Sequence, residues 1–135
     1  MLWIILATLL FQMETEADIE TGTVVIDVVG LESDQGQVVA VLFSQGEWGF
    51  PPNPNQAGFS SSSEISDLAV HLELFDVPAG NYVAMAFHDE NSNGQLDEDE
   101  EMVDFSNTPT SPQGERPSFE NMSFQHSGNV TGVRL

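Results

Sequence analysis

Oxygen-bearing side chains follow one another at regular spacing in the run Asp89–Glu100, which reads DENSNGQLDEDE. This run matches the twelve-position calcium-loop pattern D-x-[DN]-x-[DN]-G-x5-E at every defined position. Calcium prefers six to eight hard oxygen ligands, which alternate positions of a tight loop can turn toward one point. The predicted ligands are the side chains of Asp89, Asn91, Asn93, Asp97 and Glu100 and the backbone carbonyl of Gln95.

The other loop positions fit the same interpretation. Gly94 stands where the chain must reverse with a positive φ, which a residue without a Cβ adopts at little cost. Leu96 is apolar where such a loop packs on its own protein. With asparagine at two ligand positions, we expect a calcium affinity of about 10⁻⁶–10⁻³ M. The alternative is an ordinary Asn-Gly turn followed by a solvated acidic run.

Strands, not helices, are predicted to position this loop. Two-residue alternation of apolar and polar residues recurs along the chain, broken by clusters of Gly, Pro, Asn and Asp, and no helical period is sustained. Leu68, Val70, Leu72 and Leu74 share one face of a strand, and His71 lies on the other face. The predicted strands are Gly22–Gly30, Gln37–Phe43, Leu68–Phe75, Tyr82–His88, Phe119–Gln125 and Val130–Leu135.

These short strands predict an all-β domain, a small antiparallel β-sandwich of immunoglobulin-like or transthyretin-like type. The polar run Ser44–Ser63 is predicted as a long surface loop. A length of 135 residues fits a single domain, predicted over residues 18–135.

Charge limits the classes of partner. The chain has 22 acidic residues against 2 basic ones, a formal net charge of −20, and it contains no cysteine. A nucleic-acid surface needs clustered Lys and Arg, so we expect no nucleic-acid partner. The lack of cysteine excludes disulfides, cysteine-ligated zinc and thiolate nucleophiles.

The N-terminus suggests export. Leu2–Phe11 is continuously apolar and a polar stretch follows at once, as in a secretory signal, although no basic residue precedes the run. A run this short covers only about half of the ~30 Å hydrocarbon core, so no stable membrane span is expected. We predict a signal peptide or its remnant over residues 1–17 and a periplasmic or secreted monomer.

Two other kinds of site remain open. His71, His88 and His126 would form a zinc site only if neighbouring strands turned all three toward one point. A catalytic site is not predicted, because Ser60–Ser63 lacks the Gly-x-Ser-x-Gly elbow and no Gly-rich loop precedes a helix. A small hydrolase is therefore less favoured than a binding protein.

The loop 44–63 offers a different binding function. Trp48, Phe50 and Phe59 stand among Pro51, Pro52 and Pro54. Exposed aromatic side chains could meet an envelope protein or a glycan, while the same side chains folded back would cap one end of the sandwich.

The chain also resembles a known family. The runs Phe75–Ala84 and Phe87–Asp97, with their His-Asp-Glu-Asn-x-Asn-Gly core, resemble the signature of the bacterial domain of unknown function 2141 family. Phe105-Ser106-Asn107 resembles a later landmark. The resemblance implies a small exported β-sandwich without an established enzymatic activity. After Asp97 the chain departs from the family pattern, so the resemblance supports Asp89, Asn91, Asn93 and Asp97 but not Glu100.

Overall fold

The computed structural model describes residues 20–49, 52–96, 103–107 and 118–135. The predicted signal segment, residues 1–17, lies outside them. Short strands make up most of the described chain, as the alternating sequence predicts. The elements are β1 (Thr21–Val28), β2 (Gln37–Phe43), η1 (Pro54–Gln56), β3 (Phe59–Glu64), β4 (Val70–Pro78), β5 (Gly80–Asp89), β6 (Val103–Phe105), α2 (Phe119–Met122), β7 (Phe124–His126) and β8 (Val130–Arg134).

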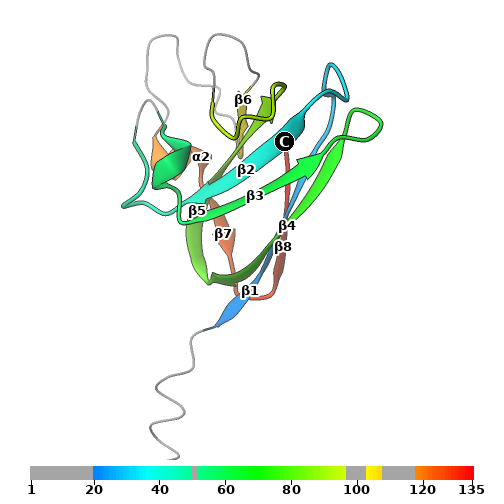
Figure 1. Ribbon diagram of the computed structural model, residues 1–135. Coiled ribbons are helices and arrows are strands. Elements are labelled where there is room, and N and C mark those ends of the chain that lie inside the picture. The colour runs from blue at the N-terminus through cyan, green and yellow to red at the C-terminus, as the bar shows by residue number, and fades with distance from the viewer. Residues whose placement is uncertain (1–19, 50–51, 97–102, 108–117) are drawn as a thin grey trace, which may run out of the picture.

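Two sheets pack face to face, which confirms the predicted small β-sandwich (Figure 1). One sheet has the order β4-β1-β8, and the other has the order β3-β2-β5-β6 with β7 also paired to β5. All pairs of neighbouring strands are antiparallel except β1 and β8, which run parallel. The turn after β7 lies beside the start of β1, where the backbone N–H of Thr23 donates to Asn129 O. The chain then continues as β8, which runs along β1 in the same direction.

Alternating side chains of both sheets fill the space between them. On β1 the inward residues Val24, Ile26 and Val28 are buried, and their partners on β4 are Leu74, Leu72 and Val70. Burying one aliphatic side chain contributes roughly 1.5–3 kcal/mol, so the six side chains of this layer stabilise the sandwich. From the second sheet, the same core receives Val38, Ala40, Leu42, Tyr82, Ala84 and Ala86.

Strand β5 is buried on both faces. Val83, Met85 and Phe87 point away from the first core into a second cluster on the outer face of the five-stranded sheet. This cluster is completed by Phe105 of β6 and by side chains from segments outside the sheet: Trp48, Ala57, Leu96, Phe119 and Met122. The end of β5 is therefore held between two layers, and the predicted calcium loop begins there.

The predicted loop 44–63 contains a strand that the sequence did not reveal. Phe59–Glu64 forms β3, which pairs antiparallel with β2. Four consecutive serines carry no apolar alternation, and backbone pairing at the sheet edge makes the strand without it. The prediction of an irregular surface loop was wrong for these residues.

Two further boundaries differ from the prediction. The predicted strand Phe119–Gln125 begins instead as α2, because the Ser118 side chain accepts a hydrogen bond from the backbone N–H of Asn121 and caps a helical turn. Leu68 was predicted to share the buried stripe of β4. It lies in the turn before β4 with a φ of 60° and is 43% exposed.

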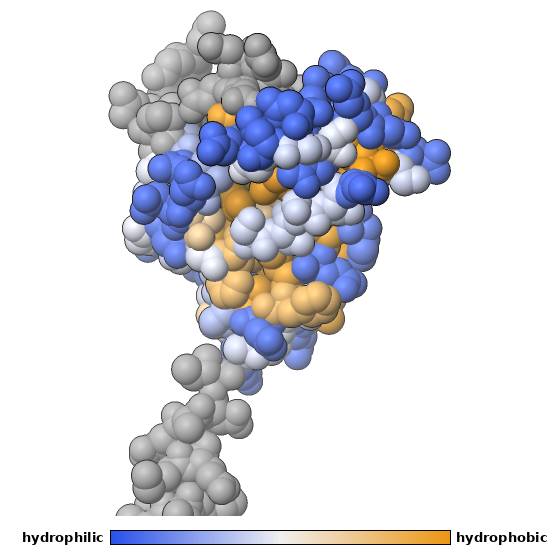
Figure 2. Space-filling model, viewed as in Figure 1, coloured by the Kyte–Doolittle hydropathy of each residue, from blue (hydrophilic) through white to orange (hydrophobic). Residues whose placement is uncertain are grey.

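Hydrophilic residues gather at the end of the molecule that carries the β1–β2 and β3–β4 turns, as Figure 2 shows. A hydrogen bond of 2.8 Å from the backbone N–H of Leu68 to Asp34 Oδ1 ties these two turns together. Within the described ranges, no helix is long and apolar enough to cross a membrane.

Candidate functional site

Asp89 is the last residue of β5 and has no exposed surface. Its Oδ2 accepts hydrogen bonds of 2.8 Å from Gly94 N and from Gln37 Nε2, and its Oδ1 accepts one of 3.3 Å from Asn93 N. A buried carboxylate needs such donors, because removing its charge from water without them costs several kcal/mol. Asp89 therefore anchors the start of the predicted calcium loop.

The loop after Asp89 turns back over this carboxylate. The backbone N–H of Ser92 donates to Asp89 O at 3.2 Å, and the φ angles of Ser92 and Gly94 are 53° and 76°. Two left-handed residues within three positions make the reversal that the sequence predicted at Gly94.

The side-chain oxygens of Asn91 and Asn93 also accept hydrogen bonds from the loop backbone. Asn91 Oδ1 lies 3.3 Å from Asn93 N, and Asn93 Oδ1 lies 2.9 Å from Gln95 N. Each bond closes a local turn of the loop backbone, and both asparagines are exposed. A carbonyl oxygen has two lone pairs, so an oxygen that accepts one N–H bond can still bind a cation.

The turn before β2 braces the loop from outside. Gln37 lies directly opposite Asp89 in the antiparallel register of β2 and β5. Gly36 has a φ of 79°, and a Cβ on it would stand 2.2 Å from Asp89 O. These contacts were missed from the sequence, because 52 residues separate Gln37 from Asp89. Only the pairing of β2 with β5 reveals them.

The structure brings together three of the predicted ligands, Asp89, Asn91 and Asn93. Gln95 is exposed and continues the loop, while predicted ligands Asp97 and Glu100 lie outside the described residues. Across the part of the chain that the structure describes, no group of three or more His, Cys, Asp or Glu side chains could hold a metal ion. Among the predicted ligands that the structure describes, Asp89 is the one carboxylate, and Asn91, Asn93 and Gln95 would contribute uncharged oxygens. Leu96 is partly buried against the second cluster, as expected for this position.

The three histidines do not form the alternative zinc site. His71 is exposed on the outer face of β4, whereas His88 and His126 are buried. Both ring nitrogens of His126 are engaged, with Thr131 Oγ1 at 2.7 Å and with Val77 O at 3.0 Å. His126 therefore links β7 and β8 to the end of β4, a structural role.

His71 makes the two ion pairs found among the described residues. Its Nδ1 donates to Asp27 Oδ1 at 2.7 Å, and its Nε2 lies 3.4 Å from Glu73 Oε1. The hydrogen bond to Asp27, followed by that to Glu73, raises the pKa of His71 above its usual value of 6.5. Cross-strand pairing of β1 with β4 brings these groups together.

The aromatic residues of the region 44–63 fold back onto the domain. Trp48 packs edge-on against Phe43 and Phe105, with ring centroids 5.5 and 6.1 Å away. Phe59 packs against Tyr82 at 6.4 Å, and Phe50 lies outside the described residues. What this region offers instead is a cleft of about 500 Å³, lined by Pro52–Asn55 and Gly94–Leu96.

These features define a small β-sandwich with a carboxylate-anchored loop at the end of its most buried strand. Residues 26–134 match the family described as an uncharacterized protein conserved in bacteria, DUF2141. The chain belongs to this family, as its His-Asp-Glu-Asn-x-Asn-Gly motif suggested. No curated protein and no solved structure matches the chain.

Proposed function

We propose that this protein is an exported calcium-binding β-sandwich with a structural or interaction role. The observation that carries the proposal is that Asp89 Oδ1 and Asn91 Oδ1 both lie 3.3 Å from the backbone N–H of Asn93, within one tight loop that also holds the Asn93 side chain. Their oxygens are hard ligands, which suit calcium better than softer transition metals. Magnesium is less suited, because it keeps its water and demands octahedral geometry.

The described ligands supply one formal negative charge, so the site needs more oxygen donors to complete six or more ligands. The backbone carbonyl of Gln95 and the side chains of Asp97 and Glu100 are the proposed remainder. A site assembled from both ends of a loop stabilises the folded chain, because the unfolded chain cannot hold the ligands together.

The unfolding free energy measured with and without calcium tests this role. At a hundredfold excess of calcium over Kd, the expected gain is about 2.7 kcal/mol. The same titration with MgCl₂ should give a smaller gain at equal concentration. Equal stability in calcium and in EDTA would remove the structural role from the proposal.

Export is part of the proposal because Leu2–Phe11 has the length and apolar character of a signal sequence. Expression of the whole chain in a bacterium, followed by fractionation and intact mass measurement, tests it. Recovery from the periplasm of a chain whose mass corresponds to a first residue near Asp18 supports export. Recovery of only the uncleaved chain in the cytoplasm argues against it.

A second candidate function is a ligand-binding module with no metal. The cleft between η1 and the loop favours it, because its lining is neutral and polar, with the amides of Asn53, Asn55 and Gln95. A neutral hydroxylated ligand such as a glycan suits these groups. Glycan binding that persists in EDTA and is lost in Asn55→Ala would favour this function over the calcium proposal.

Neither candidate function assigns the protein a catalytic reaction. The proposal therefore predicts binding without turnover, whether the ligand is calcium or a molecule in the cleft.

A further inference from the structure

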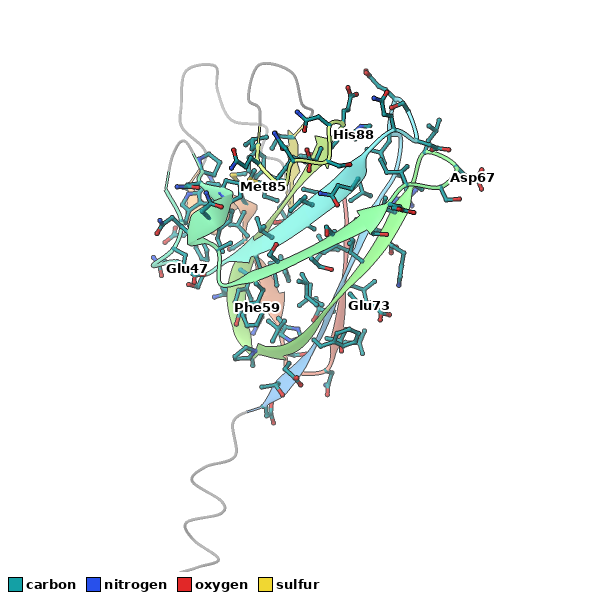
Figure 3. All side chains as sticks on the ribbon, viewed as in Figure 1. Glu47, Phe59, Asp67, Glu73, Met85 and His88 are labelled. Carbon is teal, nitrogen blue, oxygen red and sulfur yellow. The ribbon has the colours of Figure 1, made fainter. Side chains whose placement is uncertain are left out.

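His88 is part of the family motif, yet its side chain does not face the loop that the motif forms. Successive residues of a strand point to opposite faces, so Asp89 faces the loop and His88 faces the space between the sheets. Figure 3 shows His88 near the end of the sandwich, farther along β5 than Met85. The side chain is only 2% exposed. A buried imidazole in this position needs an explanation that the calcium loop does not give.

One nitrogen of the ring has a fixed role. His88 Nε2 lies 2.7 Å from the backbone oxygen of Gln35. A carbonyl oxygen can only accept, so Nε2 carries the proton and donates it. In the neutral ring, Nδ1 is then a hydrogen-bond acceptor.

The other nitrogen reaches a solvent-accessible space. No hydrogen bond joins His88 Nδ1 to another residue within the described ranges. Yet among the same residues no side-chain nitrogen or oxygen is both sealed from solvent and without a partner. Nδ1 is therefore accessible, although the rest of the side chain is buried.

A pocket of about 100 Å³ provides this access. His88 lines it together with the apolar residues Val28, Val38 and Ala86 from the inner faces of both sheets. Val103 and Asp104 of β6 also line the pocket, and both are exposed. The pocket thus combines apolar walls with two side chains whose polar atoms accept hydrogen bonds.

The chemistry of these groups selects the ligand. His88 Nδ1 can accept a hydrogen bond. Asp104 Oδ1 already accepts one of 2.8 Å from Phe105 N, and a carboxylate has lone pairs for further donors. A net charge of −20 favours a cation. The valines and Ala86 favour a short aliphatic body. At roughly 20–30 Å³ for each non-hydrogen atom, the volume admits about three to five such atoms.

We propose that this pocket binds a short primary alkylammonium ion. The ammonium donates to His88 Nδ1 and to Asp104, and the alkyl chain lies against Val28, Val38 and Ala86. Binding at this pocket is independent of calcium, since the pocket and the loop lie on opposite faces of β5.

The probe is propylammonium chloride, titrated into the full chain in EDTA at about pH 8. Backbone and methyl resonances report binding. We expect saturable shifts at Val28, Val38 and Ala86 that are the same when calcium replaces EDTA. NaCl at the same concentration is the control for charge screening. Propanol is the control for the charge of the ammonium group.

Two variants locate the site. Ala86→Leu fills the pocket and should abolish the saturable shifts, while Asp104→Asn should weaken propylammonium binding by about tenfold without affecting propanol. If Ala86→Leu fails to fold, the Asp104→Asn comparison decides alone. Shifts that NaCl reproduces, the absence of saturation, or equally tight binding of propanol would each overturn the proposal.

Discussion

Asp89 performs two tasks that can be separated by experiment. It accepts three hydrogen bonds from Gln37, Asn93 and Gly94, and it is the first predicted ligand of calcium. The hydrogen bonds hold the loop closed without a metal. Removal of the carboxylate therefore affects the fold as well as the proposed site.

Asp89→Ala should destabilise the protein in EDTA by about 2–3 kcal/mol, because three donors lose the buried charged acceptor that they share. Urea unfolding in EDTA measures this. Glu32→Ala, at an exposed acidic position, is the matched control and should change stability by less than about 0.5 kcal/mol. If Asp89→Ala unfolds at the same urea concentration as the wild type, the carboxylate does not hold the loop.

The exposed His71 predicts a pH dependence. The hydrogen bonds to Asp27 and Glu73 raise the pKa of His71 in the folded state above 6.5. A raised folded pKa contributes stability that is present below the unfolded value and is lost as pH rises through the folded value. The wild type should exceed His71→Gln in melting temperature below about pH 6, and the two should converge as pH rises above the folded value. A difference that stays constant or grows with pH would contradict this.

At the scale of single residues, the sequence predicted what local spacing determines. The positions of Asp89, Asn93 and Gly94 in one reversing loop follow from the motif alone. The role of Gln37 does not, because it depends on the register of β2 against β5. The inward direction of the His88 side chain was also not predicted, although the alternation of faces along the strand Tyr82–His88 implies it.

Among the elements, strands with alternating or continuous apolar residues were predictable, and a strand without apolar residues was not. Thr21–Val28, Gln37–Phe43 and Gly80–Asp89 lie within two residues of their predicted bounds. β3 depends on backbone pairing along a serine run, which has no side-chain signal. Residues 119–122 form a helical turn because the Ser118 cap outweighs the apolar pattern.

The β1–β2 turn is the element on which the loop depends most. Gly36→Ala adds a Cβ at a positive φ and within 2.2 Å of Asp89 O. We expect a loss of at least about 2 kcal/mol of unfolding free energy.

Gly46→Ala is the control for this substitution, since a Cβ there has no neighbour within 4 Å and Gly46 has no positive φ. Its effect should stay within about 0.5 kcal/mol. Equal effects of the two substitutions in guanidinium unfolding would show that the turn does not brace the loop.

At the scale of the whole molecule, the net charge affects the stability of the compact state. A net charge of −20 on 135 residues opposes the compact state by self-repulsion. Salt screens this repulsion over about 10 Å at 0.1 M. We therefore expect cations bound or gathered at the surface to stabilise the fold, and the proposed calcium ion would act in the same direction.

Melting temperature in EDTA should rise by several degrees between low salt and about 0.5 M NaCl. Choline chloride at the same ionic strength should give a similar rise, because screening does not depend on the cation. A melting temperature that falls steadily with NaCl would argue against self-repulsion as the main charge effect.

Calorimetric titration of calcium into the EDTA-stripped and dialysed protein tests the central claim most directly. We predict one-site binding with a Kd of about 10⁻⁶–10⁻³ M. Asn93→Ala should abolish it, because a ligand oxygen is lost. Gln95→Ala should retain it, because only the backbone carbonyl of Gln95 is a proposed ligand. The absence of saturable heat in the wild type, or equal heats in wild type and Asn93→Ala, would contradict a calcium site in this loop.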